Sequence, residues 1–369
     1  MTFTITEEQQ ELASSVAAFL DKRSPESEVR RLMEDGGAPD PAVWAQMSGQ
    51  LGLPGLIVPE EYGGGGFGFL DFALVAERTG AALMVAPLLS TVVAASALML
   101  STDEDLKSAY LPGLASGEQI GTLALAEQSG SWDISATETT VENGTDGQSR
   151  LSGVKMYVVD GQRADIIVVS ARSALGSVGL YVVEANSPEV TVTPLSTLDM
   201  TRPQVRVEFA SAMARPLTDD AAVIERVMAT AAIMLAAEQV GGAQRCLDMA
   251  VKYAKFRVQF GRPIGSFQAI KHKCADMLLN VESARSAAYY AASVLDDGTE
   301  DPLIAAALAK AHCSVAYTRV AAENIQIHGG IGFTWEHPAH LYFKRAKTSE
   351  ILLGDPATHR ERLASLVGI

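Results

Sequence analysis

The stretch Arg257-Val-Gln-Phe-Gly-Arg-Pro-Ile-Gly-Ser-Phe-Gln268 separates two long helical patterns. One pattern runs from about Ala221 to Phe256, and the next begins with Ser266 as a candidate N-cap and ends at Asp296-Asp-Gly. Such a break leaves amide groups unpaired at the start of the second helix, and these amides attract anions together with the positive end of the helix dipole. Arg257 could therefore contact a phosphate, and Gln268 could hydrogen-bond nearby. An ordinary interhelical turn with a solvated Arg257 is the alternative.

A second stretch follows a third helical pattern and reads Asn324-Ile-Gln-Ile-His-Gly-Gly-Ile-Gly-Phe-Thr-Trp-Glu-His-Pro338. The helix is expected to begin at Asp301-Pro302, a cap followed by proline at the first helical position, and to end at Gly329-Gly330. Two adjacent glycines also let a ligand approach the backbone closely, with Gln326 one turn upstream. Taken alone, a glycine pair after a helix is more often a cap than a binding loop.

The rest of the chain divides by its patterns. Residues before 120 are predicted to be helical over 5–22, 69–100 and 103–114, with a loop at Gly63–Gly66 because four successive glycines destabilise a helix. Short strand-like runs follow, beginning at Thr122, Asp165, Gly179, Val190 and Gln204. The last run alternates polar and apolar residues, as an antiparallel strand with one wet face does. Turn residues such as Asn143-Gly-Thr-Asp-Gly separate the runs.

We therefore predict an α+β fold with three domains. An N-terminal α-helical domain is expected at 1–119, a middle antiparallel β-domain at 120–218, and a C-terminal four-helix-bundle domain at 219–369. Helices as long as those after residue 219 must pack lengthwise as a bundle.

Composition excludes several classes of protein. The formal net charge of −15 argues against nucleic acid as a partner, since phosphate would be repelled. The uncharged segment 79–102 is broken by Pro87, so a buried helix or helix pair is expected there and no membrane span.

Three scattered cysteines, Cys246, Cys274 and Cys313, lie in apolar helical patterns and fit a reducing compartment. The first residues lack the pattern of an export signal, so a cytoplasmic protein is expected. No metal site is predicted, because Pro338 separates His337 from His340 and rules against a helical ligand pair.

Taken together, the two stretches resemble one family. Arg-x-x-Phe-Gly-x-Pro-Ile-x-x-Phe-Gln at 257–268 and Gln-x-His-Gly-Gly-x-Gly-Phe at 326–333 are similar to the flavin-binding signature of acyl-CoA dehydrogenases. The likeness extends to Gly52-Leu-Pro-Gly-Leu-Ile-Val-Pro-Glu-Glu-Tyr-Gly-Gly, Leu125-Ala-Glu-Gln-Ser-Gly-Ser-Trp-Asp and Gly153-Val-Lys-Met-Tyr-Val. Order and spacing agree over essentially the whole chain.

The resemblance implies α,β-dehydrogenation of an acyl-CoA thioester. In that family a carboxylate removes the α-proton, the β-hydrogen leaves as hydride to FAD, and electrons pass to an electron-transfer flavoprotein. It also implies that the adenosine-diphosphate part of FAD is gripped, across a subunit interface, by Arg257, Phe260, Gln268, Gln326, Gly329 and Gly330.

The chain departs from the family at the catalytic base. Many members keep a carboxylate where this chain has Leu353, in Ile351-Leu-Leu-Gly-Asp-Pro, and others keep it where this chain has Ala231. The nearest candidate replacement is Glu238, two turns further along the same helix and on roughly the same face. Its alanine neighbours suit a general base. The alternative is a buried, hydrogen-bonded structural glutamate.

A second departure concerns the flavin-ring side. Ala126 and Val159 stand where the family usually has a hydroxyl residue, Tyr157 replaces a customary Trp, and Trp132 replaces a customary Ser. Heterotetrameric family members that act on steroid side-chain thioesters in actinobacteria resemble this chain in their shortened C-terminus. Three hypotheses follow: a self-sufficient homotetrameric dehydrogenase, a non-catalytic FAD-supporting subunit of a heterotetramer, or a helical scaffold protein without flavin.

Overall fold

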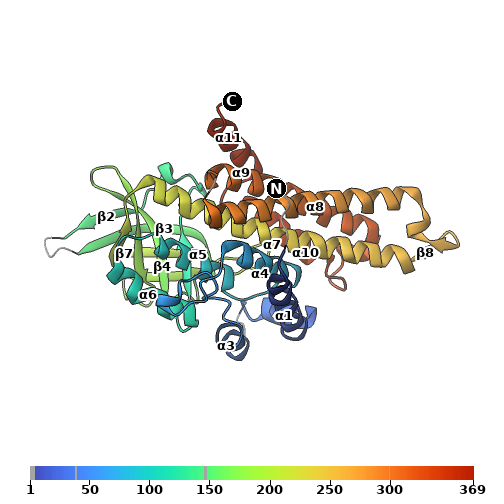
Figure 1. The fold of residues 1–369 in the computed structure, drawn as a ribbon, viewed down its shortest axis with the longest axis horizontal. Coiled ribbons are helices and arrows are strands. Elements are labelled where there is room, and N and C mark those ends of the chain that lie inside the picture. Colours follow the sequence, from blue (N-terminus) through green and yellow to red (C-terminus); the bar gives the residue numbers. More distant parts are fainter. Residues whose placement is uncertain (1–4, 38–39, 145–147, 299) are drawn as a thin grey trace. The chain divides into compact units, whose positions relative to one another are not determined.

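Helices precede and follow a block of strands in the computed structural model, which describes residues 5–37, 40–144, 148–298 and 300–369 (Figure 1). This order confirms the predicted α+β fold. The helices before the strands are α1 (Glu7–Arg23), α2 (Glu26–Glu34), α3 (Pro41–Gly49), α4 (Phe69–Ala81), α5 (Leu88–Met99) and α6 (Glu104–Ser116). Those after the sheet are α7 (Ala221–Phe256), α8 (Gln268–Asp297), α9 (Pro302–His328), α10 (Ala339–Ile351) and α11 (Pro356–Leu366).

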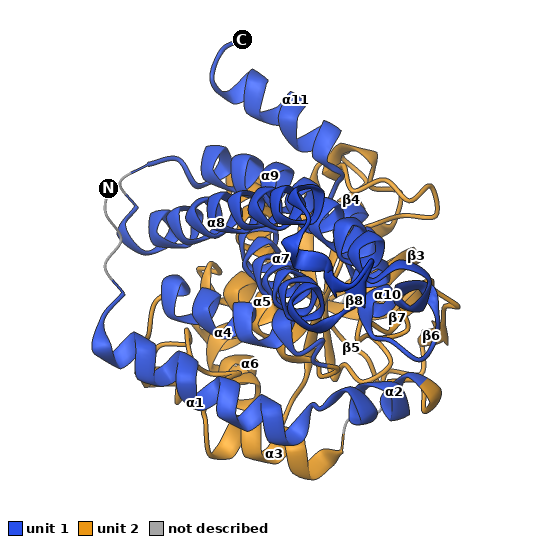
Figure 2. Cartoon of the chain, turned by 90° about the vertical axis from the view of Figure 1, so that its right-hand side faces the viewer, with its two compact units in different colours: residues 1–33, 69–84, 232–369 blue, residues 34–68, 85–231 orange. Residues whose placement is uncertain are grey.

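Two compact units divide the chain in space (Figure 2). Unit 1 combines residues 1–33, 69–84 and 232–369, and unit 2 combines residues 34–68 and 85–231. Unit 1 therefore consists mainly of helices, drawn from three separate parts of the chain. The three-domain boundaries at 119 and 218 stay a prediction.

The sheet of unit 2 closes on itself. Its strands are β1 (Gly121–Ala124), β2 (Thr140–Asn143), β3 (Ser149–Val159), β4 (Ile166–Ser173), β5 (Val178–Glu184), β6 (Val190–Pro194) and β7 (Gln204–Thr218). Strands β4, β2, β3, β7 and β5 pair in a ring, while β1 pairs with β4 and β6 pairs with β7. The interior is packed with apolar residues that include Leu151, Val169, Val207 and Phe209.

The five predicted strand runs are confirmed, with two differences. Strands β2 and β3 were not predicted, and β4 pairs in parallel with β1 and β2, so the sheet is not purely antiparallel. The alternation in β7 is confirmed, since Val205, Val207 and Phe209 are buried while Glu208 is exposed. Part of the predicted turn after Asn143, residues 145–147, lies outside the described residues.

Helix ends in unit 1 follow local signals with one exception. Asp301 caps α9 by accepting a hydrogen bond from the Leu303 amide, and Gly298 ends α8 in the left-handed region. The prediction of Ser266 as the N-cap of α8 is wrong. A 3-10 turn at Ile264–Ser266 comes first, in which the Phe267 amide donates to the Ile264 carbonyl, so Phe267 takes the cap position without a side-chain hydrogen bond.

Helices α4 and α7 approach each other closely in unit 1. A Cβ atom added to Gly80 would lie 2.0 Å from the Glu238 carbonyl oxygen, and one added to Gly241 would lie 1.7 Å from the Glu77 carbonyl oxygen. Only glycine permits this separation of the two backbones. This close crossing places Glu238 of α7 directly against α4.

The uncharged segment 79–102 is not one helix but the end of α4 and the whole of α5, and its residues are mostly buried. Among the described helices, none combines the length and apolar character needed to span a bilayer. All three cysteines are free thiols, with Cys246 and Cys313 buried and Cys274 half-buried.

Candidate functional site

A tight hairpin carries the first signature segment at the end of α7. Strands β8 (Val258–Gln259) and β9 (Arg262–Pro263) pair across Phe260 and Gly261, whose φ values are +52° and +77°. Two central residues in the left-handed region are the geometry of a two-residue hairpin that follows the twist of its strands. Phe260 is 92% exposed, with its ring edge-on to that of Phe267 at a centroid distance of 6.1 Å, and its backbone lies in a region unfavourable for a residue other than glycine.

The groups that could bind a phosphate are exposed beside this hairpin. Among the described residues, Arg257 has neither an ion pair nor a side-chain hydrogen bond. Gln268 is the first residue of α8 and is exposed, and α8 begins without a side-chain cap. Its first amides are therefore available to an anionic ligand.

The second signature segment ends α9. Gly329 terminates the helix with φ +66° and ψ −146°, and a 3-10 turn runs over Gly329–Phe333. Nothing lies within 4 Å of a Cβ atom added to Gly329 or Gly330. Gln326 is exposed one turn upstream. These two glycines are thus not required by close packing within the chain, which leaves their backbone open to a ligand.

The structure brings the ends of the two segments to the same part of unit 1. Tyr253, one turn before Arg257, packs against His328, next to Gly329, with ring centroids 4.3 Å apart. Lys273 on α8 forms an ion pair with Glu323 on α9. His337 extends the stack, with its ring centroid 4.2 Å from that of His328. Burial lowers the pKa of His328 and of His337, so both rings are neutral near pH 7.

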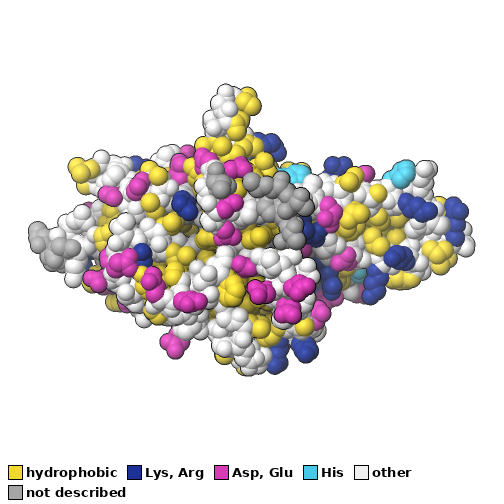
Figure 3. Space-filling model, in the orientation of Figure 1, with side chains coloured by type: hydrophobic (Ala, Val, Ile, Leu, Met, Phe, Trp, Pro, Cys, Tyr) yellow, Lys and Arg dark blue, Asp and Glu magenta, His cyan; other side chains and the backbone are white. Residues whose placement is uncertain are grey.

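Basic and apolar side chains gather around β8 (Figures 1 and 3). The exposed residues of this surface are Lys252, Lys255, Phe256, Arg257, Val258, Phe260 and Arg262. Exposed phenyl rings beside several cations, on a chain of net charge −15, give this surface both apolar and basic character.

The carboxylate of Glu238, the candidate base, forms an ion pair with another side chain. Its Oε1 atom lies 2.8 Å from Nη1 of Arg345 on α10, and the two side chains are 8% and 4% exposed. This buried pairing favours the structural role of Glu238. The two family positions hold no carboxylate either: Ala231 is buried in α7, and Leu353 lies in the turn between α10 and α11 with φ +62°.

Three buried polar residues around that turn were missed by sequence reasoning. Lys310, fully buried in α9, donates from Nζ to the carbonyl oxygens of Ser349, Glu350 and Gly354 at 3.0–3.1 Å. His359 donates from Nε2 to the Leu353 carbonyl at 2.9 Å. Arg345 is the third. The only sequence signal for this cluster was Lys310 itself, a charged residue within an alanine-rich stretch.

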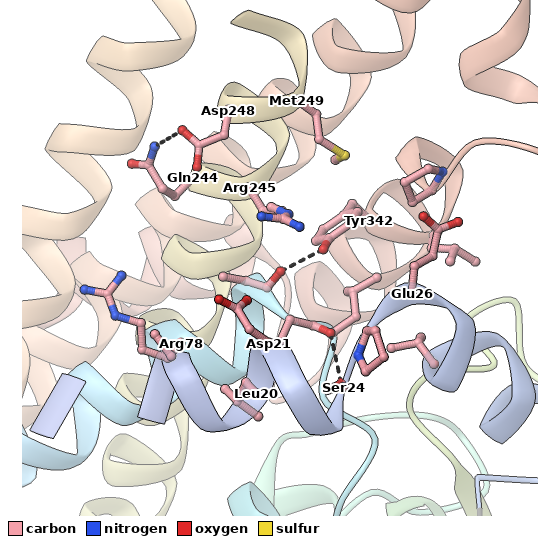
Figure 4. A pocket seen from close by; sticks show the side chains of 18 residues that line it. Leu20, Asp21, Ser24, Glu26, Arg78, Gln244, Arg245, Asp248, Met249 and Tyr342 are labelled. Atoms are coloured by element: carbon pink, nitrogen blue, oxygen red, sulfur yellow. Dashed lines mark hydrogen bonds between the residues drawn. The ribbon is translucent and has the colours of Figure 1, made fainter. Parts of the chain in front are cut away.

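A separate cavity of about 420 Å³ lies within unit 1 among α1, α2, α4, α7 and α10 (Figure 4). Arg78 and Arg245 line it together with the acids Asp21, Glu26 and Asp248. None of the signature residues lines it, and its mixed charge selects neither an anion nor a cation. The described residues contain no group of three or more side chains suited to a metal ion.

Unit 1 is thus a helical unit whose basic end carries two open glycines, and unit 2 is built on a closed sheet. The acyl-CoA dehydrogenase N-terminal domain matches residues 6–118, and the acyl-CoA dehydrogenase C-terminal domain matches residues 221–367. The chain belongs to the acyl-CoA dehydrogenase family, whose enzymes are oxidoreductases acting on CH–CH bonds of acyl-CoA thioesters.

Relatives in both sequence and structure cover nearly the whole chain. The acyl-CoA dehydrogenase IpdE2 of Mycobacterium tuberculosis is 37% identical over 365 residues, which is 99% of this chain and 98% of that protein. A variant of the steroid acyl-CoA dehydrogenase Tcur3481–Tcur3483 gives a TM-score of 0.91 at 30% identity, covering 99% of both chains. The ChsE4–ChsE5 complex of Mycobacterium tuberculosis also gives 0.91 at 30% identity, covering 100% of this chain and 99% of that one.

Proposed function

We propose that this chain is a subunit of an FAD-dependent acyl-CoA dehydrogenase and works beside a second, catalytically complete dehydrogenase-like subunit in a heterotetramer. It would support FAD by gripping the adenosine-diphosphate half across the subunit interface. When bound, FAD supplies the acceptor for the hydride that leaves the β-carbon of the acyl-CoA thioester. Electrons would then pass to an electron-transfer flavoprotein.

One observation carries the proposal of a partner: none of the three candidate base positions offers a free carboxylate. Ala231 and Leu353 cannot accept a proton, and Glu238 is paired with Arg345 at 2.8 Å in a buried position. A general base must reach the proton it removes. We therefore assign removal of the α-proton to a carboxylate of another chain, which a heterotetramer would provide.

The residues proposed to bind the nucleotide have the chemistry that a diphosphate requires. Arg257 can form a charge-assisted hydrogen bond to a phosphate oxygen, and the uncapped start of α8 at Gln268 offers amide donors. Gly329 and Gly330 leave room for the ligand to meet the backbone. Phe260 and Gln326 would contact the nucleotide from the exposed side. The ring-side positions Ala126 and Val159 lack hydroxyl groups, which fits a supporting subunit better than a complete enzyme.

Two alternatives remain from the sequence. A self-sufficient homotetramer would use Glu238 or an unrecognised base, and a flavin-free scaffold would need neither Arg257 nor the open glycines. The relatives support the heteromeric choice, since one of them is a complex of two named subunits. The free, largely buried thiols support a cytoplasmic location.

Co-expression tests the proposal. The chain is purified alone and together with each acyl-CoA dehydrogenase-like polypeptide of the same genome, and flavin content and acyl-CoA-dependent dye reduction are measured. We expect a colourless or inactive chain alone and a yellow, active complex with one partner. A yellow chain that reduces the dye alone would overturn the need for a partner. A chain that remains without flavin in every combination would favour the scaffold.

A further inference from the structure

The cavity of about 420 Å³ in unit 1 is lined by none of the residues that the proposed function assigns to FAD (Figure 4). Two hydrogen bonds hold its walls to the end of α4. The Tyr342 hydroxyl of α10 donates to the Ala81 carbonyl at 2.7 Å, and the Ser24 hydroxyl, at the end of α1, donates to the Ala82 carbonyl at 3.3 Å. Because helices from separate parts of the chain are joined in this way, the cavity is formed before any ligand binds, and its volume suits a small metabolite.

Part of the lining of this cavity is apolar. Leu20 of α1, Leu83 after α4 and Leu341 of α10 are each no more than 2% exposed, and the half-buried Met249 of α7 lines the cavity as well. Burial of an apolar group against these side chains is favourable. An occupant is therefore expected to carry a small apolar group.

Two of the five charged residues that line the cavity already have partners. Glu26 of α2 forms an ion pair with Arg30 at 2.8 Å, and Asp248 of α7 accepts a hydrogen bond from the Gln244 side chain at 2.8 Å. These two carboxylates are thus satisfied without an occupant.

The other three charged residues are incompletely paired. Asp21 and Arg245 form no ion pair with any residue that the structure describes, although the Tyr342 hydroxyl lies near Arg245. Arg78 lies 3.9 Å from the Glu77 carboxylate, and its buried Nε atom has no hydrogen-bond partner in the described part of the chain. A buried N–H group without an acceptor is unfavourable, so an acceptor supplied by a ligand would stabilise it.

These three charges come from three helices and surround one hollow (Figure 4). Arg78 lies on α4, Arg245 on α7 and Asp21 on α1. A ligand with only negative charge would be repelled by Asp21, and one with only positive charge would be repelled by both guanidinium groups. A ligand that carries a carboxylate and an ammonium group can pair with both signs at once. α-Amino acids carry these two groups on one carbon atom.

We propose that this cavity is a binding site for an α-amino acid with an apolar side chain. The carboxylate of the ligand forms charge-assisted hydrogen bonds with Arg245 and Arg78, and its ammonium group pairs with Asp21. The side chain of the ligand is buried against the apolar residues of the lining. The site lies outside the FAD contacts, so the inference does not depend on the proposed function.

Isothermal titration calorimetry of the full chain, alone or in its complex with the partner subunit, tests the site with L-leucine as the probe. We expect a dissociation constant of about 1 mM or lower. Isocaproate has the leucine skeleton without the ammonium group, and isoamylamine has it without the carboxylate. Each should bind at least about tenfold more weakly than L-leucine, because each lacks one charge-assisted contact.

Two substitutions connect these preferences to named residues. Asp21→Asn removes the partner of the ammonium group, so L-leucine should lose most of its advantage over isocaproate in this variant. Arg245→Met should weaken binding of L-leucine about tenfold and that of isoamylamine hardly at all. Both side chains are exposed and have no ion pair with the described residues, so both variants should fold. Lys22→Met, at an exposed position of α1 outside the cavity, should leave every affinity unchanged.

Three results would overturn the inference. The first is no binding of L-leucine, L-valine or L-methionine at millimolar concentration, and the second is equal affinity for L-leucine and both analogues. The third is the same order of preference in Asp21→Asn, Arg245→Met and the unaltered chain. A merely structural role of these two residues would change stability without changing the choice among the three ligands.

Discussion

Glu238 and Arg345, which are 107 residues apart, form a buried ion pair with Oε1 and Nη1 separated by 2.8 Å. Removing one charge from such a pair strands the other in a medium of low polarity. Helices α7 and α10 meet at this pair. Ala231 lies in α7, and the turn at Leu353 directly follows α10. The pair explains why a glutamate stands among alanines in α7.

Glu238→Gln should therefore change stability more than rate. We expect the free energy of unfolding to fall by about 3 kcal/mol, because the buried ion pair with Arg345 is lost, and the double variant Glu238→Gln/Arg345→Met to recover most of it. Urea denaturation measures both. The rate of the active complex should change by less than about tenfold. A loss of about 10²–10⁴ in rate would instead identify Glu238 as the base.

Lys310 should prove necessary for the turn that carries Leu353. Lys310→Met removes the donor that Ser349, Glu350 and Gly354 share, and buried carbonyl groups without a donor cost about 1–3 kcal/mol each. We expect a loss of at least about 3 kcal/mol and faster protease cleavage within 352–355. Lys271→Met, at an exposed lysine of α8, is the matched control. Equal resistance to protease in both variants would contradict this role.

His359 should make the chain less stable in mild acid. Burial lowers its pKa from 6.5 to about 4, so between these values the unfolded chain binds the extra proton and the folded chain does not. The free energy of unfolding must then fall as the pH falls from 6.5 to 4, by up to about 1.4 kcal/mol per pH unit for each such histidine. Burial also lowers the pKa of His340 to about 4, so this histidine contributes to the loss of stability in the same direction. Urea midpoints of His359→Gln should depend less on pH than those of the unaltered chain, and identical slopes would refute the assignment.

Local signals predicted much of the fold because they act over a few residues. Asp301-Pro302 and Gly298 mark helix ends through their own backbone preferences, and both predictions are confirmed. Ser266 failed because a 3-10 turn takes the residues before α8. The closed ring of strands was not predictable, since it depends on β4 pairing with strands distant in sequence.

Only those residues of the candidate site that lie in family motifs could be predicted from the sequence. The partner of Glu238 is 107 residues away and belongs to no local pattern. Tyr157, Phe260 and Leu353 all have positive φ values, yet none is glycine or asparagine. Tyr157 lies in a β-bulge of β3 and Phe260 in the two-residue hairpin between β8 and β9, and neither backbone geometry follows from the residue type.

Arg257→Ala should lower the amount of FAD bound per chain in the heteromeric complex. The guanidinium has no ion-pair partner among the described residues, so its loss should leave stability nearly unchanged while it removes a charged contact to the ligand. The ratio of absorbance at the flavin band to protein concentration measures occupancy. Arg360→Ala, at an exposed position of α11, should leave occupancy unaltered. Unchanged flavin in both variants would count against the phosphate contact.

Gly330→Ala separates folding from ligand binding more sharply. An added Cβ atom would meet nothing within 4 Å in the chain, and Gly330 does not have a positive φ, so the substitution should leave the free energy of unfolding unchanged within about 0.5 kcal/mol or raise it slightly. A dinucleotide lying on the backbone at 329–330 would collide with the new methyl group, so FAD occupancy should fall. Gly49→Ala, at another open glycine without positive φ, should alter stability as little and occupancy not at all. Because Gly330→Ala should leave the fold intact, the FAD occupancy of this variant reports on ligand binding alone. Full occupancy would therefore contradict the proposed contact. It would show that the ligand does not approach the chain at these two glycines.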